Sequence, residues 1–102
     1  MPFAEAYFGY NLNEILILKV SKEAEYSVKP NDISKREQLV DGLGTHYVRK
    51  ISYGGQMVAS VKLNFPPNSS GYVKFTLFYT ELSSTLRFYL GNGHNTWSVD
   101  CQ

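Results

Sequence analysis

Alternation of apolar and polar residues is clearest in the second half of the chain, where it predicts an antiparallel hairpin. The first arm runs from Met57 to Phe65, with apolar side chains on one face and Ser60, Lys62 and Asn64 on the other. The second arm alternates in the same way through Val73, Phe75, Leu77 and Tyr79. We expect the arms to pair across the Pro-rich loop between them, with Met57, Val61 and Phe65 on the covered face.

Such a pattern has two interpretations. Alternate faces toward lipid and water would suit a membrane-inserting hairpin, because strands of that kind need about 9 to 11 residues. A half-buried strand of a sheet gives the same pattern, and we favour it over insertion.

Further strands are predicted on both sides of this hairpin. The apolar run Ile15 to Val20 is typical of a strand covered on both faces, and residues 24–28 alternate like a strand with one wet face. Residues 45–53 are rich in β-branched and aromatic types and end at Gly54-Gly55, which predicts a bend, a bulge or a turn. Strands are also expected over 85–90 and 96–101, whereas residues 3–10 are aromatic but not periodic.

A single short helix is predicted before residue 45. Asn31 or Asp32 can cap it, Ile33, Leu39 and Val40 supply its apolar positions, and Gly42 can end it. The expected fold class is therefore α+β and mostly antiparallel β, a bent or twisted sheet with one short helix, in a single small domain over residues 1–102.

Composition narrows the function. Ten basic side chains against nine acidic ones give a net charge of +1, which provides no field for nucleic acid. The first basic residue is Lys19 and the run Ile15 to Leu18 is short, so we expect neither a signal peptide nor a membrane span in this chain. Cys101 has no second cysteine to pair with, and Asn68-Ser69-Ser70 fits a glycosylation acceptor that chance also produces often.

No constellation for catalysis is apparent in the sequence. His46 and His94 are the only histidines and lack metal-ligand spacing, and no nucleophile elbow, phosphate-binding loop or dinucleotide fingerprint occurs. We therefore expect a protein that is not an enzyme and holds no metal or cofactor.

The segment Leu39 to Gln56 resembles the signature of the membrane attack complex/perforin (MACPF) family. The matching residues are Gly44, Thr45, His46 and Tyr47 on the core motif and Gly54 with Gly55 on the glycine pair. The resemblance implies that a helix leads into the motif, that the motif opens a strand, and that the glycines help a sheet bend. These residues would be structural corner and hinge positions. Leu43 departs from the aromatic residue usual in that family, and the chain is far shorter than a full domain.

The resemblance implies a fragment or short relative of a perforin-like, pore-forming protein, of the kind secreted in immune defence or as a toxin. Its partners would be membrane lipid and further copies of itself, both in the context of a full-length domain. The alternative is an independent small β-sandwich that binds carbohydrate or lipid head groups, with Tyr89 and Trp97 as the contact aromatics.

Overall fold

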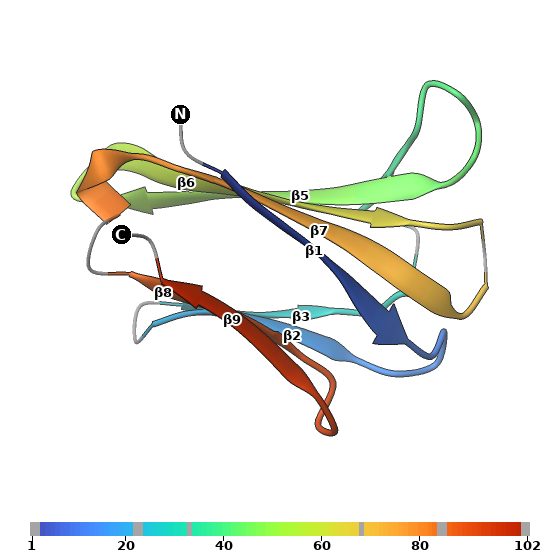
Figure 1. Ribbon diagram of the computed structural model, residues 1–102. Coiled ribbons are helices and arrows are strands. Elements are labelled where there is room, and N and C mark those ends of the chain that lie inside the picture. The colour runs from blue at the N-terminus through green and yellow to red at the C-terminus, as the bar shows by residue number, and fades with distance from the viewer. Residues whose placement is uncertain (1–2, 22–23, 33, 68, 84–85, 101–102) are drawn as a thin grey trace.

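The protein is a sandwich of two antiparallel sheets packed face to face (Figure 1). The computed structural model describes residues 3–21, 24–32, 34–67, 69–83 and 86–100. Its elements in chain order are β1 (Phe3–Tyr10), β2 (Leu16–Val20), β3 (Ala24–Val28), β4 (Glu37–Gln38), β5 (Thr45–Tyr53), β6 (Gln56–Phe65), β7 (Gly71–Tyr79), the 3₁₀ helix η1 (Glu81–Ser83), β8 (Arg87–Gly91) and β9 (Thr96–Asp100).

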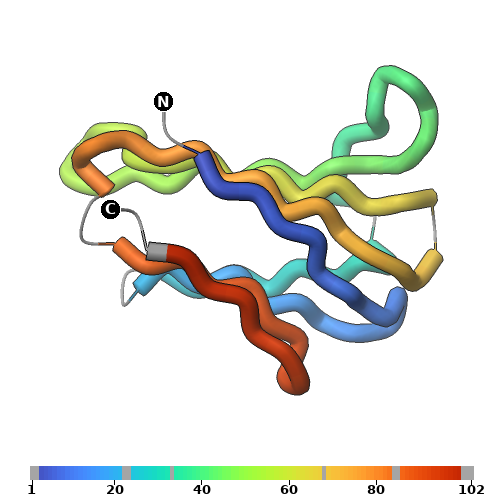
Figure 2. Tube along the Cα trace, viewed as in Figure 1, coloured from blue at the N-terminus to red at the C-terminus, as the bar shows by residue number. Residues whose placement is uncertain are grey.

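The chain crosses between the sheets three times. The five-stranded sheet has the order β1-β7-β6-β5-β4 and the four-stranded sheet the order β3-β2-β8-β9. All paired strands are antiparallel. Edge strands β1 and β9 lie along one side of the sandwich, and β5 and β3 lie along the other (Figures 1 and 2). The mostly antiparallel β expectation is confirmed, but the structure has two sheets where one bent sheet was expected.

The core is one apolar layer between the sheets. Phe75 pairs with Leu63 in the register of β7 and β6, and Leu18 pairs with Leu90 in the register of β2 and β8. All four side chains are fully buried. Because side chains on a strand point to alternate faces, each of these strands contributes every second residue to the layer. Full burial of one such side chain stabilises the fold by about 1.5 to 3 kcal/mol.

The predicted hairpin is confirmed, with one difference in its face assignment. Strands β6 and β7 pair antiparallel, and Val61 and Phe65 are buried as expected. Met57 instead is 41% exposed. A β-bulge is the reason: Ile51 pairs with Ala59 and Ser52 with Met57, so that Val58 is an extra residue that shifts Met57 to the other face.

The helix expected from Ile33 to Asp41 is corrected. Ile33 lies outside the described residues, and residues 34–41 form turns and the short strand β4, whose Glu37 and Gln38 pair with β5. Only two apolar residues fall in this stretch, Leu39 and Val40, and Val40 is fully exposed. A helix there would have had no apolar stripe to bury, so the α+β label gives way to an all-β arrangement of the described residues apart from η1.

Strand β1 was not expected from periodicity. Its inward positions include Ala4 and Ala6 beside Phe8, and its outward positions include Phe3 and Tyr7. With small residues on the inner face and aromatic residues on the outer face, the two faces of β1 differ little in hydrophobicity. The alternation that would indicate a strand is therefore weak in the sequence.

Replacement of Gly44 by alanine should unfold the β4–β5 corner. Gly44 has a φ of 145°, and a Cβ there would lie 2.2 Å from the backbone oxygen of Phe65. We expect Gly44→Ala to lower the free energy of unfolding by about 3 kcal/mol or more, from the clash and the backbone conformation together. Gly54→Ala is the matched control: its φ is 59° with no atom within 4 Å of the new Cβ, so about 1 to 2 kcal/mol is expected. Equal losses in urea denaturation would contradict the close contact at Gly44.

Candidate functional site

Thr45, His46 and Tyr47 of the Gly-Thr-His-Tyr motif begin β5, and Gly44 directly precedes the strand. Gly44 lies against the backbone of Phe65, where no larger residue fits. His46 faces β4, and its Nε2 lies 3.1 Å from Oε2 of Glu37. Tyr47 points inward and is buried, while Thr45 pairs with Phe65 across the sheet. Thus Gly44 and His46 fix the short β4–β5 hairpin.

The glycine pair lies at the opposite end of the sandwich from this motif (Figure 2). Gly54 and Gly55 have φ values of 59° and 80° and form the two-residue turn between β5 and β6. Positive φ at both central residues is what a tight hairpin of this kind requires. The sequence left a bend, a bulge and a turn open at these glycines, and the structure has the turn. The bend of the sheet that the family resemblance implied here is therefore corrected.

Tyr89 and Trp97 do not form a joint site, because they point to opposite faces of the four-stranded sheet. Trp97 pairs with Leu90, packs partly buried against the core, and has its ring centroid 4.6 Å from that of Phe75. Tyr89 pairs with Ser98 and is half-buried on the outer face. Trp97 therefore contributes to the core, and the alternation of Trp97 with Val99 was the signal that could have revealed it.

A surface that the sequence reasoning missed lies on the outer face of the five-stranded sheet. Phe3, Tyr7, Tyr72 and Phe78, here named the aromatic face, project outward from the neighbouring strands β1 and β7. Phe3 and Phe78 are paired in the register, with ring centroids 5.8 Å apart. Tyr7 is 66% and Tyr72 70% exposed.

Lysines lie in two of the cross-strand rows of the aromatic face and in the row between those two. Lys74 pairs with Tyr7 in the register, and its Nζ lies 3.4 Å from Oε2 of Glu5. Lys62 follows on β6 and Lys50 on β5. The outer face of this sheet is thus both aromatic and basic.

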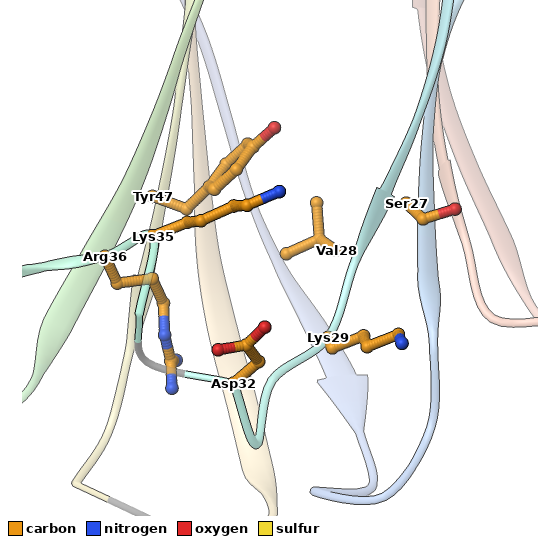
Figure 3. A pocket seen from close by; sticks show the side chains of 7 residues that line it. All are labelled: Ser27, Val28, Lys29, Asp32, Lys35, Arg36 and Tyr47. Carbon is orange, nitrogen blue, oxygen red and sulfur yellow. The ribbon is translucent and has the colours of Figure 1, made fainter.

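A pocket opens at the end of the sandwich where β3 ends and β5 begins (Figure 3). Its volume is about 220 Å³. In Figure 3 Lys35 and Val28 extend into the space between β3 and β5. The lining residues are Ser27, Val28, Lys29, Asp32, Lys35, Arg36 and Tyr47. Three cations and one carboxylate give this pocket a net charge of +2.

Arg36 is the most constrained of these cations. Its guanidinium donates a hydrogen bond to the carbonyl of Pro30 and lies over the ring of Phe65, 4.7 Å from the centroid. Tyr10 packs edge-on against the same ring and donates a hydrogen bond of 2.6 Å to the carbonyl of Ser69. Burial lowers the pKa of Arg36 and raises that of Tyr10, with a smaller opposing effect of each group on the other.

Asp32 is held by a local turn beside this arginine. Its Oδ1 accepts a hydrogen bond of 3.0 Å from the backbone N–H of Ser34. Hydrogen bonds from Ser34, with the nearby charges of Lys35 and Lys29, lower the pKa of Asp32, so the carboxylate is ionised at neutral pH.

Arg49 closes the open side of the sandwich next to the pocket. It projects inward from β5, and its guanidinium carbon lies 4.3 Å from the ring centroid of Tyr26 on β3. Its Nε donates a hydrogen bond of 3.0 Å to the Tyr47 hydroxyl. One cation thus connects β5 of the five-stranded sheet with the edge strand β3 of the other sheet.

Comparisons with protein-family models, with curated proteins and with solved structures find no match. In the described part of the chain no helix is long and apolar enough to span a membrane. The same residues contain no group of three or more His, Cys, Asp or Glu side chains that could hold a metal ion. Cys101 and Asn68 lie outside the described residues.

Loss of the Arg49 bridge should weaken the whole sandwich. Arg49→Met keeps most of the side-chain volume but removes the cation over Tyr26 and the bond to Tyr47, so we expect a loss of about 1 to 2 kcal/mol in the free energy of unfolding. Lys50→Met, one residue on and exposed on the outer face, is the control and should change stability by less than about 0.5 kcal/mol. Equal urea midpoints for both variants would refute the bridge.

Proposed function

We propose that this protein is a non-catalytic module that docks on lipid membranes through the outer face of its five-stranded sheet. One observation carries the proposal, namely the unequal distribution of exposed large hydrophobic side chains. Within the described residues, β1, β5, β6 and β7 expose six of them on that outer face: Phe3, Tyr7, Val48, Met57, Tyr72 and Phe78. The strands of the four-stranded sheet expose none among their described side chains.

The chemistry of this face suits the boundary between water and lipid. Tyrosine has an apolar ring and a polar tip, and aromatic side chains accumulate where one end is apolar and the other wet. Lysines beside them add attraction to anionic head groups, worth about 1 kcal/mol each near such a surface. Lys50, Lys62 and Lys74 occupy those positions, while Glu5 lies beside Lys74 on the edge strand β1 and Glu37 beside His46 on β4.

The β4–β5 hairpin loop supports the same orientation. Its residues Val40 and Leu43 are 109% and 70% exposed, although turn tips usually carry polar residues. The loop rises on the outer side of the five-stranded sheet (Figure 1). Both residues are therefore placed to enter a membrane on which the aromatic face rests.

The resemblance of Leu39 to Gln56 to the MACPF family leads to the same partner. In a full-length, secreted domain of that kind the module would meet lipid together with further copies of itself. The glycine pair would then serve as a hairpin turn, because Gly54 and Gly55 connect β5 to β6.

Vesicle binding tests this proposal. We expect wild-type protein to co-sediment with vesicles of phosphatidylcholine and phosphatidylserine. Tyr7→Ser combined with Tyr72→Ser should weaken the binding about tenfold or more, since two apolar rings no longer leave water. Melting temperature should change little, because both rings are exposed.

Tyr89→Ser is the matched control, as this tyrosine lies on the outer face of the other sheet. An equal loss with Tyr89→Ser, or wild-type protein that stays in the supernatant with every vesicle, would refute the assigned face. Wild-type binding to an insoluble polysaccharide but to no vesicle would favour the carbohydrate alternative and overturn the membrane proposal.

A further inference from the structure

The pocket between β3 and β5 has the charge of a site for a doubly charged anion. It is separate from the aromatic face, because Tyr47 points inward whereas the aromatic face points outward. Lys29, Lys35 and Arg36 outnumber the single carboxylate of Asp32, which leaves the net charge of +2. We propose that this pocket binds a phosphate monoester, whose charge of about −1.5 to −2 at neutral pH matches it.

Arg36 is the anchor of the proposed site. The Pro30 carbonyl and the Phe65 ring hold its guanidinium in one place, so little side-chain entropy remains to be lost on binding. Its Nε is buried and has no hydrogen-bond partner among the described residues. A buried donor without an acceptor is costly, but this atom is closed to a ligand in the open pocket, so Arg36 would act on an anion there through the charge of its guanidinium.

Tyr47, Ser27 and two exposed lysines complete the lining. The Tyr47 hydroxyl accepts a hydrogen bond from Arg49, so its own proton is available to a ligand. Ser27 lines the rim of the pocket from β3, with its hydroxyl directed away from the space between β3 and β5 (Figure 3). Lys29 and Lys35 are exposed and can turn their ammonium groups toward a bound anion.

The size of the pocket restricts the ligand. About 220 Å³ is below the range of roughly 300 to 1,000 Å³ that is typical of drug-sized ligands. A phosphate group with a small substituent fits this volume better than a nucleotide.

The Asp32 carboxylate predicts the direction in which charge substitutions should change the affinity of the pocket for an anion. Its carboxylate is fixed by the backbone N–H of Ser34 and stays in the pocket, where it neutralises one of the three cations. An incoming anion must overcome that repulsion. Removal of the Asp32 charge should therefore strengthen binding, whereas removal of a lysine charge should weaken it.

The phosphate could belong to a soluble monoester or to a lipid head group. The soluble case is independent of the proposed function. The lipid case rests on it, since β5 begins directly after the loop that carries Val40 and Leu43. A probe without lipid therefore tests the pocket by itself.

The experiment is a titration of the ¹⁵N-labelled 102-residue chain with glycerol phosphate, followed by NMR at constant ionic strength. We expect saturable shifts at Ser27 to Arg36 and at Tyr47, and none at the distant turn of Gly54. Lys35→Gln should raise the dissociation constant about fivefold to tenfold, and Asp32→Asn should lower it about threefold or more. Lys19→Gln, an exposed lysine on β2, should leave it unchanged.

Each contrary result overturns the proposal. Shifts that do not saturate, equal losses with Lys35→Gln and Lys19→Gln, or weaker binding with Asp32→Asn would all exclude a phosphate site here. Vesicles then separate the two sources. If the ligand is a lipid phosphate, Lys35→Gln should weaken binding to vesicles that contain phosphatidic acid more than binding to vesicles that contain phosphatidylserine. If the ligand is a soluble monoester, the substitution should affect binding to both kinds of vesicle equally. If the wild-type protein bound no vesicles but still showed saturable shifts with glycerol phosphate, only the membrane proposal would be refuted.

Discussion

The fold depends on a single apolar layer that both sheets must fill from opposite sides. A chain of 102 residues buries only about 60 to 65 percent of its unfolded surface, so few inward positions can be left without an apolar side chain. Leu16, Leu18, Phe88 and Leu90 fill the layer from the four-stranded sheet, and Val61, Leu63, Phe75 and Leu77 fill it from the other. Strand alternation then fixes every outer position as well, because a slip of one residue would exchange the two faces of a strand.

This constraint gives the outer faces their functional meaning. Packing restricts inward positions to apolar residues, whereas outward positions can be polar. Examples on the four-stranded sheet are Lys19, Glu25 and Arg87. Outward aromatics such as Tyr7 and Tyr72 contribute little to the core and are not needed for the strand pattern. Their presence on one sheet, together with Lys50, Lys62 and Lys74, is the basis of the proposed contact with a membrane.

Regular alternation made most of the fold predictable, and its interruptions explain the rest. The pairing of β6 with β7 follows from the residues alone, but the bulge at Val58 moved Met57 outward, and no sequence rule locates a bulge. The sequence predicted a strand directly after Gly44, and the structure has it. The helix predicted before it was wrong for residues 34–41, because the residues that could cap and end a helix also suit turns. Pairing of Glu37 and Gln38 with β5 decided the structure of this segment. Trp97 was misassigned as a surface residue because its type was weighed above its position in an alternating strand.

The pocket could not be predicted because it arises from the length of β4. That strand has two residues, so it covers β5 only at Thr45 and His46 and leaves the side of the sandwich toward β3 open beyond them. Tyr26, Tyr47 and Arg49 fill the middle of this opening with a cation between two rings. Toward the end, Asp32, Lys35 and Arg36 cover it only in part, and the uncovered remainder is the pocket. Polar residues in a connecting loop are ordinary in sequence. The short edge strand makes them face one another across a space, and that arrangement exists only in three dimensions.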